Sequence, residues 1–183
     1  LAANGARHLL TNGLVLGATV DAESDGQVSS GATGDGSDED GVQFNQELLI
    51  GKLVAGDVTV SQDGLLDAWV DWNRDGVFGA DERIATSTPM VAGLNSLEVQ
   101  IPATIEPGIV FARFRVSSAG GLEPTGVAIN GEVEDYRLNI IRGSWHNSVI
   151  ATDVNNDSQT SPLDAIIVIN EMDSRSISDP ITG

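Results

Sequence analysis

The sequence predicts a mainly β fold: an antiparallel β-sandwich with calcium-binding loops, followed by a small EF-hand-like loop–helix module. Three observations lead to this prediction. Runs of β-forming residues recur between residues 43 and 141, loops with the spacing of calcium ligands occur twice, and the second loop leads into an apolar helical run. We therefore expect a sandwich domain at residues 1–141, a linker at 142–152 and the loop–helix module at 153–183.

The composition narrows the classes of function. The 183 residues include 27 acidic and 9 basic side chains, for a net charge of -18. This balance argues against nucleic acid and anionic membrane surfaces, because both attract Lys and Arg. The chain has no cysteine, which excludes disulfides, thiolate zinc sites and thiol catalysis. Because 40% of the residues are hydrophobic, we expect a folded protein with acidic loops and not a disordered chain.

The sequence contains no recognisable targeting or membrane segment. No run approaches the roughly 20 apolar residues of a membrane helix, so we expect no membrane insertion. No signal peptide is recognisable. Because the chain begins at Leu1 without Met, we expect it to be a piece of a longer protein.

The first 42 residues combine one apolar run with an acidic stretch. The run from Leu14 to Val20 predicts a strand. The acidic stretch has the spacing of a calcium loop at its start but no acid at position twelve, so more distant acids would have to close it. Its candidate ligands are Asp21, Glu23, Asp25, Asp38 and Asp40. The alternative is a solvated, flexible loop, which the intervening Gly and Ser residues favour.

Six runs rich in β-formers predict the strands of the sandwich. They lie near Gln43–Ile50, Asp57–Ser61, Leu65–Trp72, Ser96–Ile101, Val110–Ser117 and Asp135–Ile141. In the third and fifth runs, apolar residues alternate with polar or aromatic ones. The apolar set is Leu66, Ala68, Val70 and Trp72 in one run and Val110, Ala112, Phe114 and Val116 in the other. A period of two is typical of half-buried antiparallel strands.

The segment from Asp71 to Glu82 matches a twelve-position calcium loop. Asp71, Asn73 and Asp75 fall at positions one, three and five, and Gly76 falls at six, where the backbone turns sharply. Val77 would offer its carbonyl at seven, and Glu82 both carboxylate oxygens at twelve. We predict a calcium site formed by Asp71, Asn73, Asp75, Val77 and Glu82. The alternative is an acidic turn between strands.

Three carboxylates stand together in Gly131–Tyr136, before the last predicted strand. Glu132, Glu134 and Asp135 repel one another unless a cation or an arginine lies among them. Arg113 and Arg115 on the polar face of the neighbouring strand could be the partners. A calcium ion shared with residues 21–40 and a purely exposed run of charge are the other interpretations.

A second calcium loop is predicted after the linker. Its candidate ligands are Asp153, Asn155, Asp157, Gln159 through its carbonyl, and Asp164. Ser158 occupies the position where Gly is expected, so this loop should bind more weakly. The loop leads into a helix at residues 163–172, with Ser161 as N-cap and Pro162 at the first position. This helix is apolar nearly all round, which predicts burial or a partner.

Residues 1 to about 141 resemble the GEVED domain. The resemblance is carried by Gly131–Tyr136, by Val20–Gly26, by the loop Trp72–Gly76 and by Ala112–Arg115. It implies a β-sandwich module of large, secreted, multi-domain bacterial surface proteins, without catalytic activity.

Residues 153–172 resemble one repeat of a type I dockerin, in which a calcium loop precedes a helix. A complete dockerin has two such repeats, and only one is present here. The resemblance implies a protein partner of the cohesin type, docked through residues 163–172. Because dockerins are often attached to polysaccharide-degrading enzymes, it also implies an association with polysaccharide catabolism.

The sequence offers no catalytic motif, so we expect no enzyme. It contains no nucleophile elbow, no phosphate-binding glycine loop and no zinc-type histidine pair, and its two histidines, His8 and His146, are isolated. We predict a calcium-binding extracellular or cell-surface module that acts as a spacer or adhesion domain with a docking element. The alternative is a carbohydrate-binding module or an accessory part of a glycoside hydrolase, with Trp69 or Trp72 as an exposed platform.

Overall fold

The computed structural model describes residues 5–9, 13–18, 40–142, 152–154 and 159–176. The chain divides into two compact units, Leu1–Arg142 and Gly143–Gly183. The first unit is built from strands, and the second contains helix α1 (Pro162–Ser176). Within the described ranges, no helix has the length and apolar character needed to cross a bilayer.

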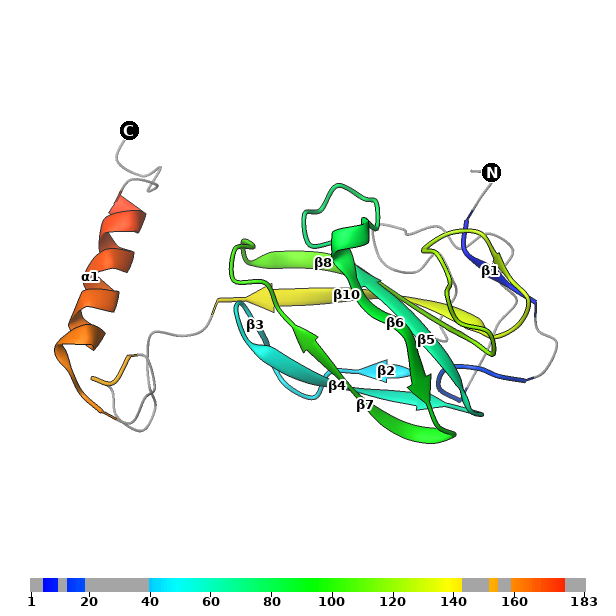
Figure 1. The fold of residues 1–183 in the computed structure, drawn as a ribbon. Helices are drawn as coiled ribbons and strands as arrows, with labels where there is room; N and C mark the ends of the chain where they lie inside the picture. The colour runs from blue at the N-terminus through cyan, green and yellow to red at the C-terminus, as the bar shows by residue number, and fades with distance from the viewer. Residues whose placement is uncertain (1–4, 10–12, 19–39, 143–151, 155–158, 177–183) are drawn as a thin grey trace. The chain divides into compact units, whose positions relative to one another are not determined.

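The larger sheet of the first unit has five strands (Figure 1). In spatial order these are β3 (Leu48–Leu49), β10 (Glu132–Ile141), β8 (Gly108–Ser117), β5 (Gly64–Val70) and β6 (Arg83–Met90). Its neighbours pair antiparallel, except for β3, which pairs parallel with the end of β10. The β8–β10 ladder runs from Glu132↔Val116 to Ile140↔Gly108, and this register fixes which side chains of both strands face the core.

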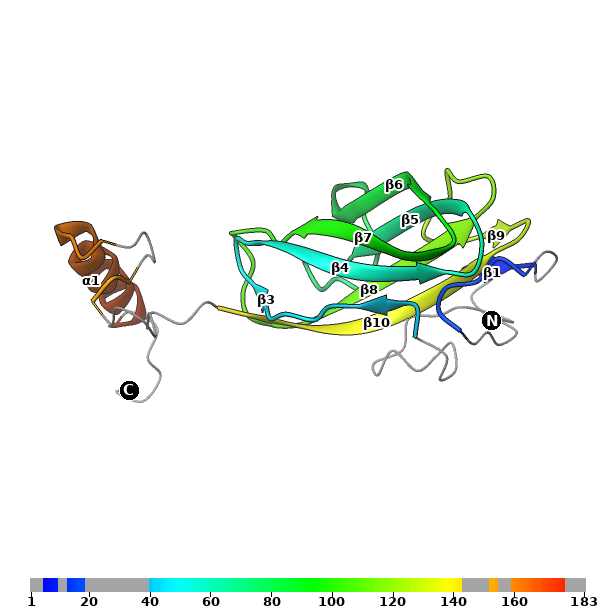
Figure 2. The same ribbon diagram turned by 90° about the horizontal axis from the view of Figure 1, so that it is seen from below.

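A second sheet of three strands forms the other layer (Figure 2). Its order is β2 (Val42–Gln43), β4 (Leu53–Val60) and β7 (Gly93–Gln100). Val58 of β4 and Val99 of β7 join Phe114 of β8 in one buried apolar cluster between the sheets. Burying each such side chain contributes roughly 1.5–3 kcal/mol. The prediction of a mainly β, sandwich-like fold is confirmed.

The apolar alternation of β5 and β8 is confirmed, but its polar counterpart is not exposed. Leu66, Ala68 and Val70 lie in the core, as do Val110, Ala112, Phe114 and Val116. Asp67, Trp69, Arg113 and Arg115 on the opposite face are also at most 2% exposed. Their cover includes the loop from Ser118 to Asn130 and the short parallel pair of β1 (Arg7–His8) and β9 (Val127–Ala128). The expectation of half-buried strands was therefore wrong for these two strands.

Two predicted strands differ from the structure. Within residues 13–18, only Leu16 makes a β-bridge, to Val60, although Leu14 and Leu16 are both buried. The run Gln43–Ile50 splits, because the chain leaves the three-stranded sheet after Gln43 and joins the five-stranded sheet at Leu48. Strand β6 was not predicted. It contains Pro89, which an edge strand tolerates because one side of its backbone needs no partner.

Candidate metal centre

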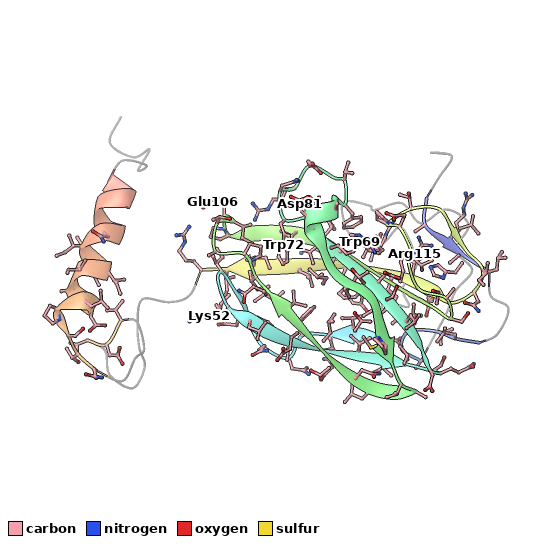
Figure 3. All side chains as sticks on the ribbon, viewed as in Figure 1. Lys52, Trp69, Trp72, Asp81, Glu106 and Arg115 are labelled. Carbon is pink, nitrogen blue, oxygen red and sulfur yellow. The ribbon has the colours of Figure 1, made fainter. Side chains whose placement is uncertain are left out.

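The loop Asp71–Glu82 follows strand β5 and ends in a single 3-10 turn, η1 (Ala80–Glu82). Figure 3 labels Trp72 and Asp81 near its two ends. Gly76 has φ 81°, and nothing lies within 4 Å of the position a Cβ would occupy. The need for glycine at loop position six is therefore conformational, since L-residues with side chains disfavour this left-handed backbone.

The oxygen side chains of the loop turn toward its own backbone N–H groups. Asp71 accepts hydrogen bonds from the N–H groups of Asp75 (3.1 Å) and Gly76 (3.0 Å). Asn73 and Asp75 each accept from the residue two positions ahead, at 2.8 Å. Glu82 closes the loop, with one carboxylate oxygen on Asn73 N–H (3.1 Å) and the other on Gly79 N–H (2.8 Å). The four side chains thus gather around one short stretch of backbone.

The oxygens of these four side chains are of the chemical kind that calcium prefers. Calcium prefers carboxylate, amide and carbonyl oxygens, and a carboxylate oxygen that accepts one N–H retains a lone pair for a cation. Asp71 and Glu82 are buried, at 4% and 2% exposure, so their charges are removed from most of the solvent. The described residues contain no group of three or more His, Cys, Asp or Glu side chains that could hold a metal ion. The calcium site predicted for this loop, which also includes the amide of Asn73 and the carbonyl of Val77, therefore stays a prediction.

Arg74 fixes the loop to the neighbouring strand β8. Its φ is 62°, and its guanidinium donates to the carbonyls of Ile109 (2.9 Å) and Glu106 (2.5 Å). Because two carbonyls hold one planar guanidinium, the first turn of the loop keeps its place at the end of the sheet. Sequence reasoning missed this role, since it depends on a contact more than 30 positions away in the chain.

The second predicted loop is described only in part, because Asn155 and Asp157 lie outside the described residues. Asp153 and Asp164 are buried, at 0% and 3% exposure, whereas Gln159 is exposed. Asp164 accepts from Val154 N–H (2.9 Å) and from Ser161 N–H (2.7 Å), while the Ser161 hydroxyl accepts from Leu163 N–H (3.2 Å). This reciprocal capping confirms the helix start that the sequence predicts. The helix continues to Ser176, beyond the predicted end at Met172.

The structure assigns a different partner to each carboxylate of the segment Glu132–Asp135. Asp135 forms a two-pronged ion pair with Arg113, at 2.7 and 2.6 Å. Glu132 accepts from Leu16 N–H at 2.6 Å. Glu134 accepts from the N–H groups of Asp40 (3.2 Å) and Gly41 (3.1 Å) and from the Tyr136 hydroxyl (2.9 Å). All three acids are buried, so the interpretation as exposed charge was wrong.

Of the two predicted arginine partners, only Arg113 pairs with an acid of this segment.

Asp40, a candidate ligand in the acidic stretch at residues 21–40, accepts a hydrogen bond from Ala18 N–H at 2.9 Å. Asp21, Glu23, Asp25 and Asp38 lie outside the described residues, so a metal site at residues 21–40 stays a prediction. Glu132 and Glu134 thus attach the N-terminal segments to β10 by accepting N–H groups that no strand pairs.

Glu134 is the acid whose titration the fold changes most clearly. Burial raises the pKa of Glu134 from 4.5 to about 7, despite the hydrogen bonds from Tyr136 and Gly41 that favour the charged form. Gly131, at the start of the segment, has φ 94°, and a Cβ there would lie 1.8 Å from the carbonyl oxygen of Val116. The first residue of this motif is therefore glycine for both conformational and steric reasons.

His8 and Arg115 form a buried pair that ties β1 to the sheet. Arg115 donates from Nε to Nε2 of His8 at 3.0 Å and from its other nitrogens to the carbonyls of Arg7, Glu123, Thr125 and Gly126. Since arginine only donates, His8 must accept at Nε2 and donate from Nδ1 to the Asn130 carbonyl, 2.8 Å away. Burial and the nearby Arg115 lower the pKa of His8 to about 3, which fits a structural role for this histidine.

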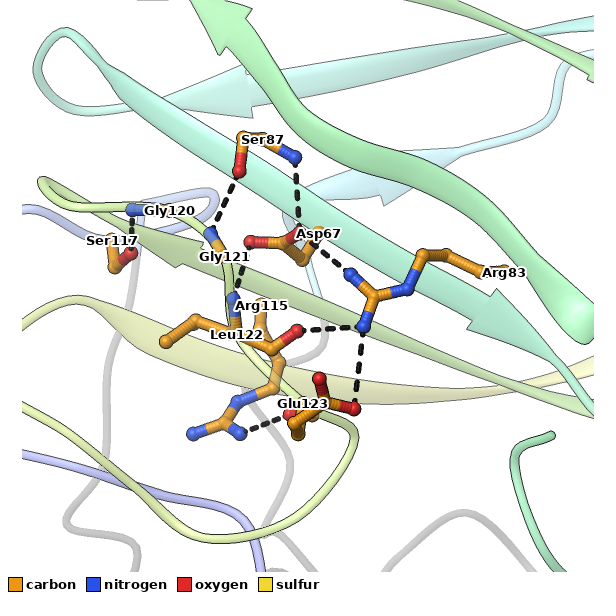
Figure 4. Close-up of polar contacts among 9 residues, drawn as sticks. All are labelled: Asp67, Arg83, Ser87, Arg115, Ser117, Gly120, Gly121, Leu122 and Glu123. Carbon is orange, nitrogen blue, oxygen red and sulfur yellow. Dashed lines mark hydrogen bonds and ion pairs between the residues drawn. The ribbon is translucent and has the colours of Figure 1, made fainter. Parts of the chain in front are cut away.

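A further polar cluster joins β5 and β6 to the loop after β8 (Figure 4). Asp67 accepts from Arg83 (3.1 Å), Ser87 N–H (3.0 Å) and Leu122 N–H (3.0 Å). The Arg83 guanidinium also lies 4.6 Å from the centroid of the Trp69 ring. Trp69 is 1% exposed, and Trp72 packs against the apolar core. Neither of these two tryptophans offers the open platform that a carbohydrate module would need.

The first unit also has an open groove, beside the outer edge of β10. It has a volume of about 390 Å³ and is lined by residues from the chain between Val42 and Leu48 and from Tyr136 to Ile141. Gln43, Gln46 and Asn139 are exposed there. The groove therefore presents amide groups and the charged residues Glu47 and Arg137 beside partly buried apolar side chains.

The fold and the site together define a mainly β module. Its buried charged side chains hold the loops in place by hydrogen bonds to their backbone. Residues 65–139 match the model of the GEVED domain, a family of non-catalytic modules. This match covers β5 through most of β10, including the loop at Asp71–Glu82 and the segment Glu132–Asp135. The predicted resemblance to this family is confirmed for that part of the chain.

Comparison with curated proteins finds no match. Among solved structures, one similar chain is a family 123 glycoside hydrolase from Clostridium perfringens, studied for glycolipid glycan hydrolysis. The likeness has 14% sequence identity and a TM-score of 0.28, and it covers 53% of this chain and 22% of the hydrolase. A likeness at that TM-score carries no conclusion about this chain.

Proposed function

We propose that the first unit is a non-catalytic module whose fold is stabilised by calcium held in the loop Asp71–Glu82. The observation that carries this proposal is the inward arrangement of Asp71, Asn73, Asp75 and Glu82 around one stretch of backbone. When bound, the ion would offset the mutual repulsion of these side chains and link the end of β5 to the start of β6. Binding to the folded state alone then adds stability by mass action.

The module would serve as a spacer or adhesion domain of a larger secreted or cell-surface bacterial protein. Support comes from the match of residues 65–139 to the GEVED domain and from the net charge of -18. Calcium is abundant outside cells, and extracellular modules bind it at roughly 0.1–1 mM. The rigid ladder of β8 and β10 and the buried ion pairs suit a module that keeps its shape within a chain of domains.

The second unit would act as a docking element for a cohesin-like protein partner. Four large apolar side chains on α1 are at least half exposed: Leu163, Ile166, Ile169 and Met172. A helix with so much exposed apolar surface gains stability when a partner covers it. Asp153, Asn155, Asp157, Gln159 and Asp164 would hold a second calcium ion at its N-terminus.

Calorimetric titration of the full chain with calcium tests both sites. We expect binding by the wild-type chain, loss of the stronger component in Asp75→Ala and loss of the weaker one in Asp157→Ala. A matched control is Asp57→Asn, which removes one carboxylate from β4 that belongs to neither loop. Absence of heat from calcium binding in the wild type would overturn the proposal.

Titration with a purified type I cohesin, with and without Ile166→Asp, tests the docking element.

A carbohydrate-binding module is the second candidate, favoured by the groove beside β10. Amides such as Gln43, Gln46 and Asn139 are typical partners of sugar hydroxyls, because they donate and accept in one plane. Retardation of the chain in gels that contain soluble polysaccharides, abolished by Gln46→Ala with Asn139→Ala, would support this candidate. Equal mobility across a broad panel of glycans would exclude it.

A further inference from the structure

The ion pair of Asp135 and Arg113 connects two parts of the first unit that are far apart in sequence. Both side chains are buried, at 1% and 3% exposure, and they meet through two hydrogen bonds. Because Asp135 pairs with Arg113 across the β8–β10 ladder, the strand register fixes where the guanidinium lies. A bidentate pair of this kind restricts orientation as well as position.

Arg113 also reaches two loops on the outer face of the sheet. It donates to the Pro124 carbonyl at 2.8 Å. Its guanidinium carbon lies 5.4 Å from the centroid of the Phe78 ring, within the range of a cation–π contact. Phe78 is the eighth residue of the loop Asp71–Glu82, directly after the position whose carbonyl would bind calcium.

We propose that Asp135 is a positioning residue for the calcium loop: it orients Arg113, and Arg113 holds Phe78 so that the loop keeps its binding conformation. This inference rests on the proposed calcium site. It also gives Asp135 a role other than that of a metal ligand, which the sequence left open. Arg74 fixes the first turn of the loop, and Phe78 fixes its second half, so the two contacts act on opposite sides of Gly76.

The expected effect follows from preorganisation. If Phe78 is released, the loop must be ordered when calcium binds, and the affinity falls by that cost. A cation–π contact of a buried arginine supports a weakening of about three- to tenfold in Kd. Asp135→Asn should therefore weaken calcium binding by about that factor, although Asp135 does not line the loop.

A double-mutant cycle separates positioning from simple electrostatics. Calcium Kd values are measured by calorimetry for Asp135→Asn, Phe78→Ala and the double variant, in full chains that carry Asp157→Ala to silence the second loop. If Asp135 acts through Phe78, its substitution weakens binding in the Phe78 background but not in the Phe78→Ala background. An equal weakening in both backgrounds would mean that only charge matters, and it would overturn the inference.

Three further variants serve as controls for this test. Val99→Ala lowers stability from the other sheet, and its unchanged Kd would show that loss of stability alone does not weaken binding. Phe78→Tyr keeps the π face and should bind like wild type, whereas Phe78→Leu should bind about three- to tenfold more weakly. Equal Kd values for these two variants overturn the inference even if Asp135→Asn does not fold. Absence of calcium binding in the wild-type background would instead overturn the proposed function, which distinguishes the two failures.

Discussion

The loops Asp71–Glu82 and Asp153–Asp164 have similar closing acids but different neighbours. In both, the first and last acids are buried, and the last acid accepts a backbone N–H from the start of the loop. Both acids use their second oxygen on the N–H three residues earlier, but Glu82 thereby caps only the short turn η1, whereas Asp164 caps the 15-residue helix α1. The same substitution should therefore affect calcium binding in one unit and helix stability in the other.

The largest calcium-dependent effect is expected for Glu82→Gln. Glutamine keeps one acceptor oxygen but loses the charge and the second oxygen, so the first loop should lose its calcium-dependent stability. With extracellular affinities of roughly 0.1–1 mM, about 10 mM calcium adds about 1.4–2.7 kcal/mol to the free energy of unfolding. Chemical denaturation with and without calcium measures this difference. The exposed Glu98→Gln is the control, and a full calcium response in Glu82→Gln would contradict the account.

Glu134 makes the free energy of unfolding depend on pH, independently of calcium. This pH dependence must be measured separately from the calcium responses of the two loops. Because its pKa is raised from 4.5 to about 7 in the fold, the folded state binds a proton that the unfolded state has already lost. The stability that this proton contributes is complete below pH 4.5 and is lost as the pH rises to about 7. At higher pH, Glu134→Gln should be more stable than wild type by up to about 3 kcal/mol.

Denaturation in chelator at several pH values measures the effect of Glu134. The lowered pKa of His8 has the opposite sign, since its contribution is lost as the pH falls from 6.5 toward 3. The difference between wild type and Glu134→Gln removes the His8 contribution, because both chains share it. A constant difference from pH 4 to 8 would show that Glu134 does not titrate as the fold requires.

A smaller effect is expected for Asp164→Asn. It weakens the capping of α1, which should cost about 1 kcal/mol of helix stability. Helical circular dichroism should decrease, and the melting of the first unit should stay unchanged. Glu82→Gln is the matched comparison, since it neutralises the equivalent position without touching the helix. If Asp164→Asn and Glu82→Gln lost the same amount of helix signal, the claim that only Asp164 caps helix α1 would be wrong.

The smallest effect is expected for Ser158→Gly, at a position outside the described residues. If the second loop follows the calcium pattern, Ser158 costs about 1 kcal/mol in a left-handed turn. Replacement by Gly should tighten calcium binding about fivefold at that loop alone. Calorimetry in an Asp75→Ala background measures it, and an unchanged Kd would mean that this position does not need a left-handed backbone.

The apolar half of the fold could be predicted from sequence, and the polar half could not. Leu66, Phe114 and their alternating neighbours were placed correctly because a period of two depends only on the strand itself. Burial of Asp67, Trp69 and Arg115 depends on a loop that covers them from elsewhere in the chain. Strand β6 escaped prediction because it contains Pro89, which a sheet tolerates essentially only at an edge, and edge position is a property of the whole sheet.

The candidate site shows the same division. The ligand spacing of Asp71–Glu82 is local, so it could be predicted. The pairing of Asp135 with Arg113 was one of several interpretations, and strand register was needed to select it. The roles of Arg74 and Phe78 had no signal in the sequence, because an arginine and a phenylalanine are ordinary residues until their distant partners are known.

The most direct test of the central claim is a thermal melt of the full chain in about 10 mM calcium and in chelator, with Asp75→Ala alongside. We expect calcium to raise the wild-type midpoint by roughly 3–10 °C, as follows from about 1.4–2.7 kcal/mol in a domain of this size, and Asp75→Ala to remove most of the rise. Asp157→Ala should remove little of it. A wild-type midpoint that is the same in calcium and in chelator would contradict the account.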